Sequence, residues 1–187
     1  AHVRVEQLPG KGIDDGLWDP KKDPLIKSRY SREHLEGKKE NKTELQRYCG
    51  LDISPRLPLF GMVSRLAEQK GMDLLLEIAD SFLSKEVQFV LLGDGDDIYK
   101  TIFRNMMARH GKNAAVTFNF DVAMAHQIYA GSDFFLMPSL YEPCGLGQLI
   151  SLRYGTIPVA RRTGGLVDTI IDADEDPKKG NGFIFME

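Results

Sequence analysis

From residue 57 onward, short apolar runs alternate with longer amphipathic segments. The short runs are largely β-branched or aromatic and are bounded by Gly, Pro, Asp or Asn, a pattern that predicts strands. These runs are Leu59–Val63, Val87–Leu92, Ala114–Phe118, Asp133–Met137, Ile157–Ala160 and Gly182–Phe185. Strands that alternate with helices form βαβ units, which place the strands parallel and the helices on both faces of the sheet.

The segments between these runs predict five helices, which are Gly71–Leu83, Asp96–His110, Val122–Ala130, Leu146–Tyr154 and Leu166–Ile171. Several of the predicted strands lack polar alternation, which is typical of a sheet buried on both sides. We therefore expect an α/β fold with a doubly wound, Rossmann-like parallel sheet of about six strands. In such a sheet ligands bind beyond the carboxyl ends of the strands, so the loops that follow the strands are the candidate sites.

Residues 1–54 differ from the rest of the chain because they are polar and rich in turns. They contain one predicted helix, Asn41–Tyr48, which Gly50 ends. We expect this segment to pack on a single domain formed by residues 55–187. The stretch 27–47 carries seven Lys or Arg and four Glu, and these interspersed charges are typical of a solvated face.

Composition excludes several classes of partner. The formal net charge is −3, and without a concentrated positive face we expect neither nucleic acid nor a membrane surface as a partner. No apolar run approaches the ~20 residues that span a bilayer, and the first residues lack the apolar core of a signal peptide. The two cysteines, Cys49 and Cys144, have no metal-ligand or disulfide spacing, which favours a reducing compartment.

The loop after the first predicted strand carries two cations, Arg65 and Lys70, just before a predicted helix. A helix N-terminus offers free N–H groups and the positive end of a dipole, so cations beside it form an anion site. Arg grips phosphate oxygens bidentately, and Lys adds a movable point charge. The alternative is that both side chains are solvated surface residues.

The loop after the fourth predicted strand combines an acid, a cysteine and two glycines. Gly145 and Gly147 allow a ligand to approach the backbone closely, and the helix start at Leu146 offers N–H groups to a phosphate. Glu142 can accept hydrogen bonds from sugar hydroxyls, or it can be a carboxylate stabilised by a helix dipole. Cys144 is by itself more typical of a small buried residue than of a reactive one.

The loop after the fifth predicted strand contains Thr163, Gly164 and Gly165. A Gly-Gly pair before a helix suits a phosphate or ribose contact, and the alternative is a plain turn with Thr163 as the N-cap.

Two other patterns resemble known binding motifs but do not match them. Residues 92–95 lack the third glycine of a dinucleotide fingerprint, and Asp94-Gly95-Asp96 predicts a turn and helix start rather than a metal site. The histidines lack paired metal-ligand spacing, and His126 is expected to pack or to form a local hydrogen bond.

Together these loops resemble the glycogen and starch synthases. The resemblance runs from about Gly12 to Phe185 and depends on four motifs in order, with shorter matches at Glu36–Lys38 and Asn41–Lys42. The motifs are Ser64–Gly71 (SRLAEQKG), Tyr141–Leu149 (YEPCGLGQL), Arg153–Val159 (RYGTIPV) and Thr163–Thr169 (TGGLVDT).

The resemblance implies a retaining glucosyltransferase of the GT-B fold, in which two Rossmann-like domains face each other across a cleft. The C-terminal domain binds ADP-glucose, and glucose passes to the non-reducing end of an α-1,4-glucan without cofactor or metal. By this resemblance Arg65 and Lys70 hold the diphosphate and Glu142 hydrogen-bonds the glucose. Residues 144–147 line the sugar and phosphate pocket, and Phe120 lies near the adenine.

The resemblance also implies a missing N-terminal synthase domain, missing final helices and an interdomain hinge within residues 1–54. Lys11 stands where the family carries an Asn, so we expect an altered contact to the sugar or hinge. Ile150 replaces a second Glu found in many related enzymes, so ribose must be bound otherwise. We expect a cytoplasmic enzyme if the source is bacterial and a plastid enzyme if it is a plant or alga. The alternatives are a non-catalytic glucan- or partner-binding module and a transferase that uses UDP-glucose.

Overall fold

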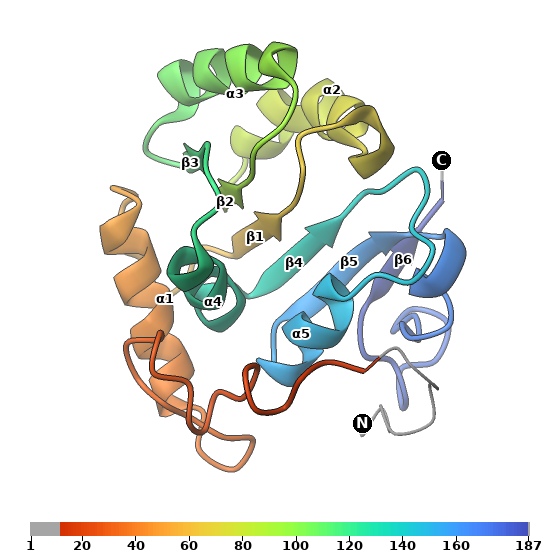
Figure 1. Ribbon diagram of the computed structural model, residues 1–187. Coiled ribbons are helices and arrows are strands. Elements are labelled where there is room, and N and C mark those ends of the chain that lie inside the picture. Colours follow the sequence, from red (N-terminus) through yellow and green to blue (C-terminus); the bar gives the residue numbers. More distant parts are fainter. Residues whose placement is uncertain (1–11, 187) are drawn as a thin grey trace.

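A parallel sheet of six strands forms the centre of the computed structural model, which describes residues 12–186 (Figure 1). The strand order is β3-β2-β1-β4-β5-β6, and every neighbouring pair is parallel. The strands are β1 Leu59–Val63, β2 Gln88–Leu92, β3 Ala114–Thr117, β4 Phe134–Met137, β5 Ile157–Arg161 and β6 Phe183–Phe185. The predicted doubly wound sheet is confirmed, and the strand ends shift by one residue or not at all.

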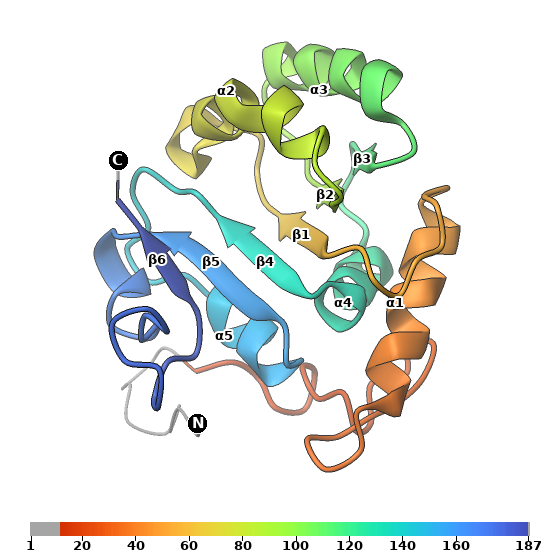
Figure 2. The same cartoon turned by 180° about the vertical axis from the view of Figure 1, so that it is seen from behind.

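Helices cover both faces of the sheet. One layer contains α2 and α3, and the other contains α1, α4 and α5, as the views from the two sides show (Figure 1, Figure 2). The helices are α1 Glu36–Tyr48, α2 Met72–Leu83, α3 Asp97–His110, α4 Val122–Gly131 and α5 Gly147–Arg153.

Alternate residues of the strands face the two layers. In β2, Phe89 and Leu91 pack with α2 and α3, whereas Val90 and Leu92 pack with α1, α4 and α5. Each layer therefore has its own apolar core, and both cores hold the same sheet.

The order of the strands reverses between β1 and β4. The chain builds β2 and β3 on one side of β1 and then returns to place β4 on the other side. The loops after β1 and β4 start side by side at this switch point, where doubly wound folds bind their ligands. Gly71 (φ 72°) ends the first loop, and a Cβ atom there would lie 1.9 Å from the carbonyl oxygen of Pro138. The two loops therefore pack against each other only because residue 71 has no side chain.

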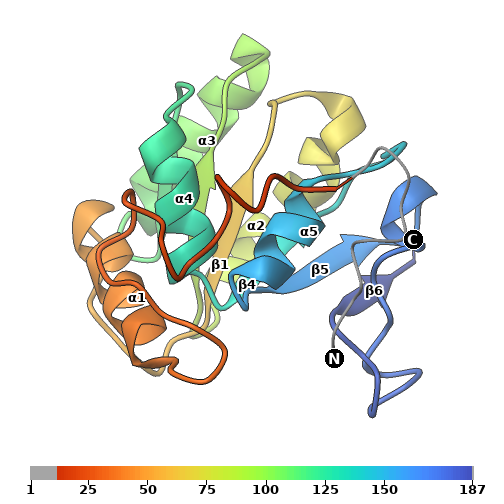
Figure 3. The ribbon, with the colours of Figure 1, turned by 60° about the horizontal axis from the view of Figure 1, so that its bottom comes forward.

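Residues 12–35 form an irregular segment that lies across α4 and α5 (Figure 3). The buried carboxylate of Asp23 accepts a hydrogen bond from the Tyr154 hydroxyl at 2.6 Å and lies 2.7 Å from His126 Nδ1. Trp18 stacks on the His126 ring at 4.0 Å, and the Tyr30 hydroxyl donates to the Tyr154 carbonyl at 2.8 Å. His126 thus packs as expected, but its hydrogen-bond partner is distant in the sequence rather than local. Lys11 lies outside the described residues.

Two helix predictions need correction. The predicted helix Leu166–Ile171 is wrong, because the chain forms only a 3-10 turn at Gly164–Leu166 and then further turns. β-branched residues disfavour a helix, and the Thr169 hydroxyl bonds back to the carbonyls of residues 165 and 166. The first helix starts at Glu36 rather than Asn41. Within residues 12–186 no helix is long and apolar enough to cross a membrane.

Candidate active site

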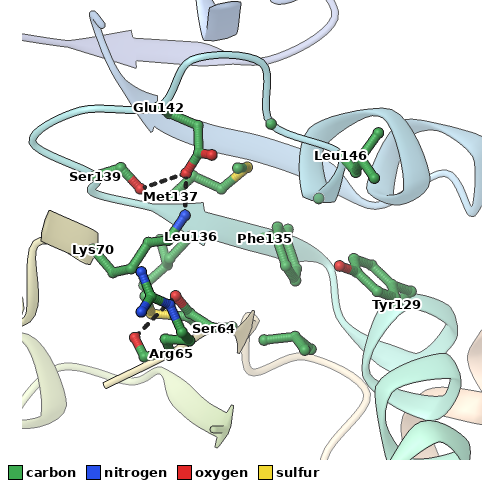
Figure 4. A pocket seen from close by; sticks show the side chains of 14 residues that line it. Ser64, Arg65, Lys70, Tyr129, Phe135, Leu136, Met137, Ser139, Glu142 and Leu146 are labelled. Carbon is green, nitrogen blue, oxygen red and sulfur yellow. Dashed lines mark hydrogen bonds and ion pairs between the residues drawn. The ribbon is translucent and has the colours of Figure 1, made fainter. Parts of the chain in front are cut away.

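A pocket of about 290 Å³ opens at the carboxyl edge of the sheet, where β1 and β4 lie side by side (Figure 4). The loop after β1 contributes Ser64, Arg65 and Lys70 to its wall. The loop after β4 contributes Ser139, Glu142 and the stretch that leads into α5. The pocket thus lies at the switch point of the sheet.

The centre of the pocket wall is an ion pair between the two loops. Lys70 Nζ lies 2.5 Å from Glu142 Oε2, and the Ser139 hydroxyl donates to the same oxygen at 3.2 Å. The two side chains are 20% and 12% exposed, so this is a sheltered pair rather than a surface one. Glu142 is therefore not a plain helix-start carboxylate, because its partners are a cation and a hydroxyl.

Arg65 lies on the same side of the pocket as Lys70 (Figure 4). Its side chain is exposed, and Nη2 donates to the Gln69 side-chain oxygen at 3.4 Å. A guanidinium carries five N–H donors, so most of its donor capacity remains for a ligand. Among the charged residues that line the pocket, two are cations and one is an anion, which favours a negatively charged ligand.

The loop that leads into α5 brings backbone to the pocket. Gly145, Leu146 and Gly147 line it, whereas Cys144 does not. Gly145 adopts the left-handed conformation (φ 65°) that glycine favours. The buried amide of Gln148 donates to the carbonyls of residues 144 and 145 at 3.0 Å each, and these two bonds fix the conformation of the turn.

The third predicted loop supports the second one rather than lining the pocket. The Thr163 hydroxyl donates to the Leu140 carbonyl at 3.2 Å, so it does not cap a helix as the alternative reading required. The Gly165 N–H donates to the Glu142 carbonyl at 2.9 Å. Gly164 packs so closely that a Cβ atom there would lie 2.1 Å from the Glu142 carbonyl oxygen. These three residues therefore hold the backbone of the loop that carries Glu142.

Other predicted positions lie outside the pocket. Phe120, in the loop after the edge strand β3, is 85% exposed and does not line it. Ile150 belongs to α5 and is buried in the core. Asp94 pairs with Lys100 of α3 at 2.5 Å, as suits a turn before a helix. Among residues 12–186 no group of three His, Cys, Asp or Glu side chains is arranged to hold a metal ion.

Sequence reasoning missed part of the pocket wall. Tyr129 of α4 and Phe135 of β4 both line the pocket, and their rings stack at 4.7 Å. Both residues fall inside apolar patterns that indicate core positions, so no local signal marks them as pocket residues. Ser139 could have been found, because it is a polar residue directly after a strand at the candidate edge.

The comparison with protein families decides the affiliation of the chain. Residues 51–187 match the family described as Glycosyl transferases group 1. The chain belongs to this family. The resemblance to glycogen and starch synthases is confirmed by relatives of known name, such as the glycogen synthase of Syntrophotalea carbinolica, which is 50% identical over 188 residues. That match covers 100% of this chain and 39% of the synthase, so the chain spans about two fifths of its relative.

Solved structures agree with the affiliation. The catalytic domain of starch synthase IV from Arabidopsis thaliana, solved with ADP and acarbose, is 39% identical and has a TM-score of 0.88. The match covers 94% of this chain and 37% of the starch synthase chain. The C-terminal domain of a group 1 glycosyl transferase from Francisella tularensis shares the fold, with a TM-score of 0.63 and 18% identity. That match covers 94% of this chain and 80% of the Francisella domain.

Proposed function

We propose that this chain is the donor-binding domain of a glycogen or starch synthase that transfers glucose from ADP-glucose to the non-reducing end of an α-1,4-glucan with retention. The observation that carries the proposal is the convergence of Arg65, Lys70 and Glu142 in one pocket at the switch point of the sheet. The chain's 50% identity with a glycogen synthase supports the substrate class.

In this proposal the two cations hold the diphosphate of the donor. Bond cleavage at the glucose leaves negative charge on ADP, and cations already in place stabilise that charge as it develops. Glu142 hydrogen-bonds glucose hydroxyls from the loop after β4. Leu146 and the backbone of Gly145 and Gly147 shape the sugar end of the pocket.

The outer donor residues are also part of the proposal. Phe120 contacts the adenine from its exposed position, and Cys144 contributes through its backbone. Thr163, Gly164 and Gly165 act at the donor pocket mainly by holding the Glu142 loop, as their hydrogen bonds and close packing support.

The whole enzyme contains a second domain that carries the acceptor surface and closes the cleft. This chain matches 39% of the Syntrophotalea carbinolica synthase, and the remaining length of that relative supports such a second domain. The bacterial source of the Syntrophotalea carbinolica synthase supports a cytoplasmic setting rather than a plastid one. No metal or cofactor enters the proposed reaction.

Calorimetric titration of the chain with ADP and with UDP tests the proposal. ADP should bind more tightly than UDP, and Arg65→Ala and Lys70→Ala should each weaken ADP binding. Tighter binding of UDP would favour the UDP-glucose alternative. Affinity for maltooligosaccharides without any nucleotide affinity would favour the non-catalytic binding module.

A further inference from the structure

Gln69 joins the two loops that build the pocket, although it does not line the pocket itself. Its backbone carbonyl accepts a hydrogen bond from the Leu140 N–H at 2.9 Å. Its side-chain Nε2 donates to the Tyr141 carbonyl at 3.1 Å, and its Oε1 accepts from Arg65 Nη2 at 3.4 Å. Both ends of one amide are therefore in use, one on each loop.

The Gln69 side chain forms a bridge between Arg65 on the first loop and the Tyr141 carbonyl on the second, and this bridge lies beside the ion pair of the pocket. Lys70, the next residue, pairs with Glu142, which directly follows Tyr141. The bridge therefore lies one residue away from the ion pair on both loops. Arg65 is exposed, and the Gln69 oxygen restricts the directions that its long side chain can take.

We propose that Gln69 is a positioning residue that fixes the spacing of the two loops and orients Arg65 toward the diphosphate. This inference rests on the proposed function, because it assumes that Arg65 binds an anionic ligand. Orienting Arg65 in advance lowers the conformational entropy lost when the ligand binds, which strengthens binding without a direct contact.

The chemistry of the bridge requires an amide. A Gln side chain donates through its NH2 group and accepts through its oxygen, and here both functions are used. Gln69→Met keeps the length of the side chain but loses both bonds. Gln69→Glu keeps an acceptor for Arg65 but places a carboxylate against the Tyr141 carbonyl, so two acceptors face each other.

The test measures ADP affinity by calorimetry for the wild type, Gln69→Met, Gln69→Glu, Arg65→Ala and the double variant Arg65→Ala/Gln69→Met. Loss of two hydrogen bonds near the site should weaken ADP binding about tenfold in Gln69→Met. Gln69→Glu should also weaken binding, because it loses the side-chain hydrogen bond to the Tyr141 carbonyl. In the Arg65→Ala background, Gln69→Met should weaken ADP binding by less than about threefold, because the side chain that Gln69 orients is no longer present.

Gln46→Met is the matched control. Gln46 is a buried glutamine at the amino-end edge of the sheet, and both ends of its amide are also hydrogen-bonded. Its Nε2 donates to the Ser54 carbonyl and to Gln88 Oε1, and its Oε1 accepts from the Ser54 N–H. Its loss should lower the midpoint of thermal unfolding but leave ADP affinity unchanged. A merely structural role of Gln69 would give the same pattern as this control.

The possible failures are distinguishable. If Gln69→Met and Gln69→Glu bind ADP like the wild type while Arg65→Ala does not, the inference is wrong and the proposed function stands. If Gln69→Met costs the same with and without Arg65, the orienting role is wrong. If Gln69→Met does not fold, Gln69→Glu alone decides, and wild-type affinity in that variant overturns the inference. If the wild type does not bind ADP, the proposed function itself fails.

Discussion

The ammonium group of Lys70 lies 2.5 Å from a carboxylate oxygen of Glu142, and the loops that carry them are joined in space but separated by 72 positions in the chain. The partner of the cation in this structure is thus a carboxylate, the same kind of anionic oxygen group that a phosphate presents. In the proposed function, we expect a diphosphate to compete with Glu142 for Lys70 and its arrival to free the carboxylate for the sugar hydroxyls.

Glu142→Gln tests this competition. The variant keeps the shape of the side chain but removes the negative charge that holds Lys70. We expect ADP, which has no sugar to contact, to bind the variant several-fold more tightly than the wild type, since one ion-pair competitor is lost. Calorimetry at low and high salt measures this change. Weaker ADP binding in the variant would contradict the competition and would indicate that Glu142 supports the phosphate site.

Lys70→Ala and Arg65→Ala should each weaken ADP binding by roughly 10- to 100-fold, the range expected when a charged hydrogen bond is lost. Lys70→Ala should also lower the free energy of unfolding, because it leaves the sheltered Glu142 carboxylate with only the Ser139 hydroxyl. Arg65→Ala should leave the unfolding free energy unchanged within ~0.5 kcal/mol, because that side chain is exposed. Chemical denaturation beside calorimetry separates the two effects.

Lys38 predicts a pH dependence of stability. Its ammonium group donates to the carbonyls of residues 130 and 154 and to the Thr156 hydroxyl, and burial lowers its pKa from 10.5 to about 7. Between these two pKa values the unfolded chain binds more protons than the folded one, so stability rises as the pH rises from 7. From about pH 7 to about pH 8.5 the unfolding free energy should increase by roughly 1–2 kcal/mol.

The control for this prediction is Lys38→Met, which removes the titrating group and should flatten the curve over the same interval. Denaturant titrations at both pH values measure the difference between the two proteins. At higher pH a second group opposes the trend. Burial raises the pKa of the Cys49 thiol to about 12, so ionisation of this thiol in the unfolded chain lowers stability above its usual pKa. A wild-type curve parallel to that of Lys38→Met would contradict the prediction.

Trp18→Ala should destabilise the whole domain rather than only the segment around it. Trp18 stacks on His126 and meets Tyr129 edge-on at 5.5 Å, so its removal opens a cavity beside α4. We expect a loss of roughly 2–4 kcal/mol. Tyr48→Ala is the matched control, because that aromatic side chain on α1 is 62% exposed and its loss should cost less than ~0.5 kcal/mol. A single cooperative transition in both proteins would show that one unit unfolds.

Regular periodicity made the sheet and most helices predictable from the sequence. The run at residues 88–92 is buried throughout, as a strand between two helical layers must be. The helix predicted at Leu166–Ile171 failed because the pattern there was apolar but short and β-branched. The start of α1 was missed because its first residues are polar, and its stability comes from contacts such as that of Lys38 with Thr156.

The candidate site was predictable only where residues stand in loops after strands. Arg65, Lys70 and Glu142 stand in such loops, and topology brings them to one edge. Their pairing was not predictable, because nothing local to Lys70 indicates a carboxylate 72 positions later. Pocket residues on regular elements, such as Tyr129, are indistinguishable in sequence from core residues.

The contacts of Asp23 with His126 and Tyr154 have a practical consequence for domain exchange between related transferases. The family match begins at residue 51, yet the buried Asp23 carboxylate belongs to the same interior as α4 and α5. A chimera spliced at residue 51 would join a foreign polypeptide to an interior shaped for residues 12–50. Crossover points upstream of Ile13 keep this interior intact, so they should give folded hybrids more often than crossovers at the family boundary.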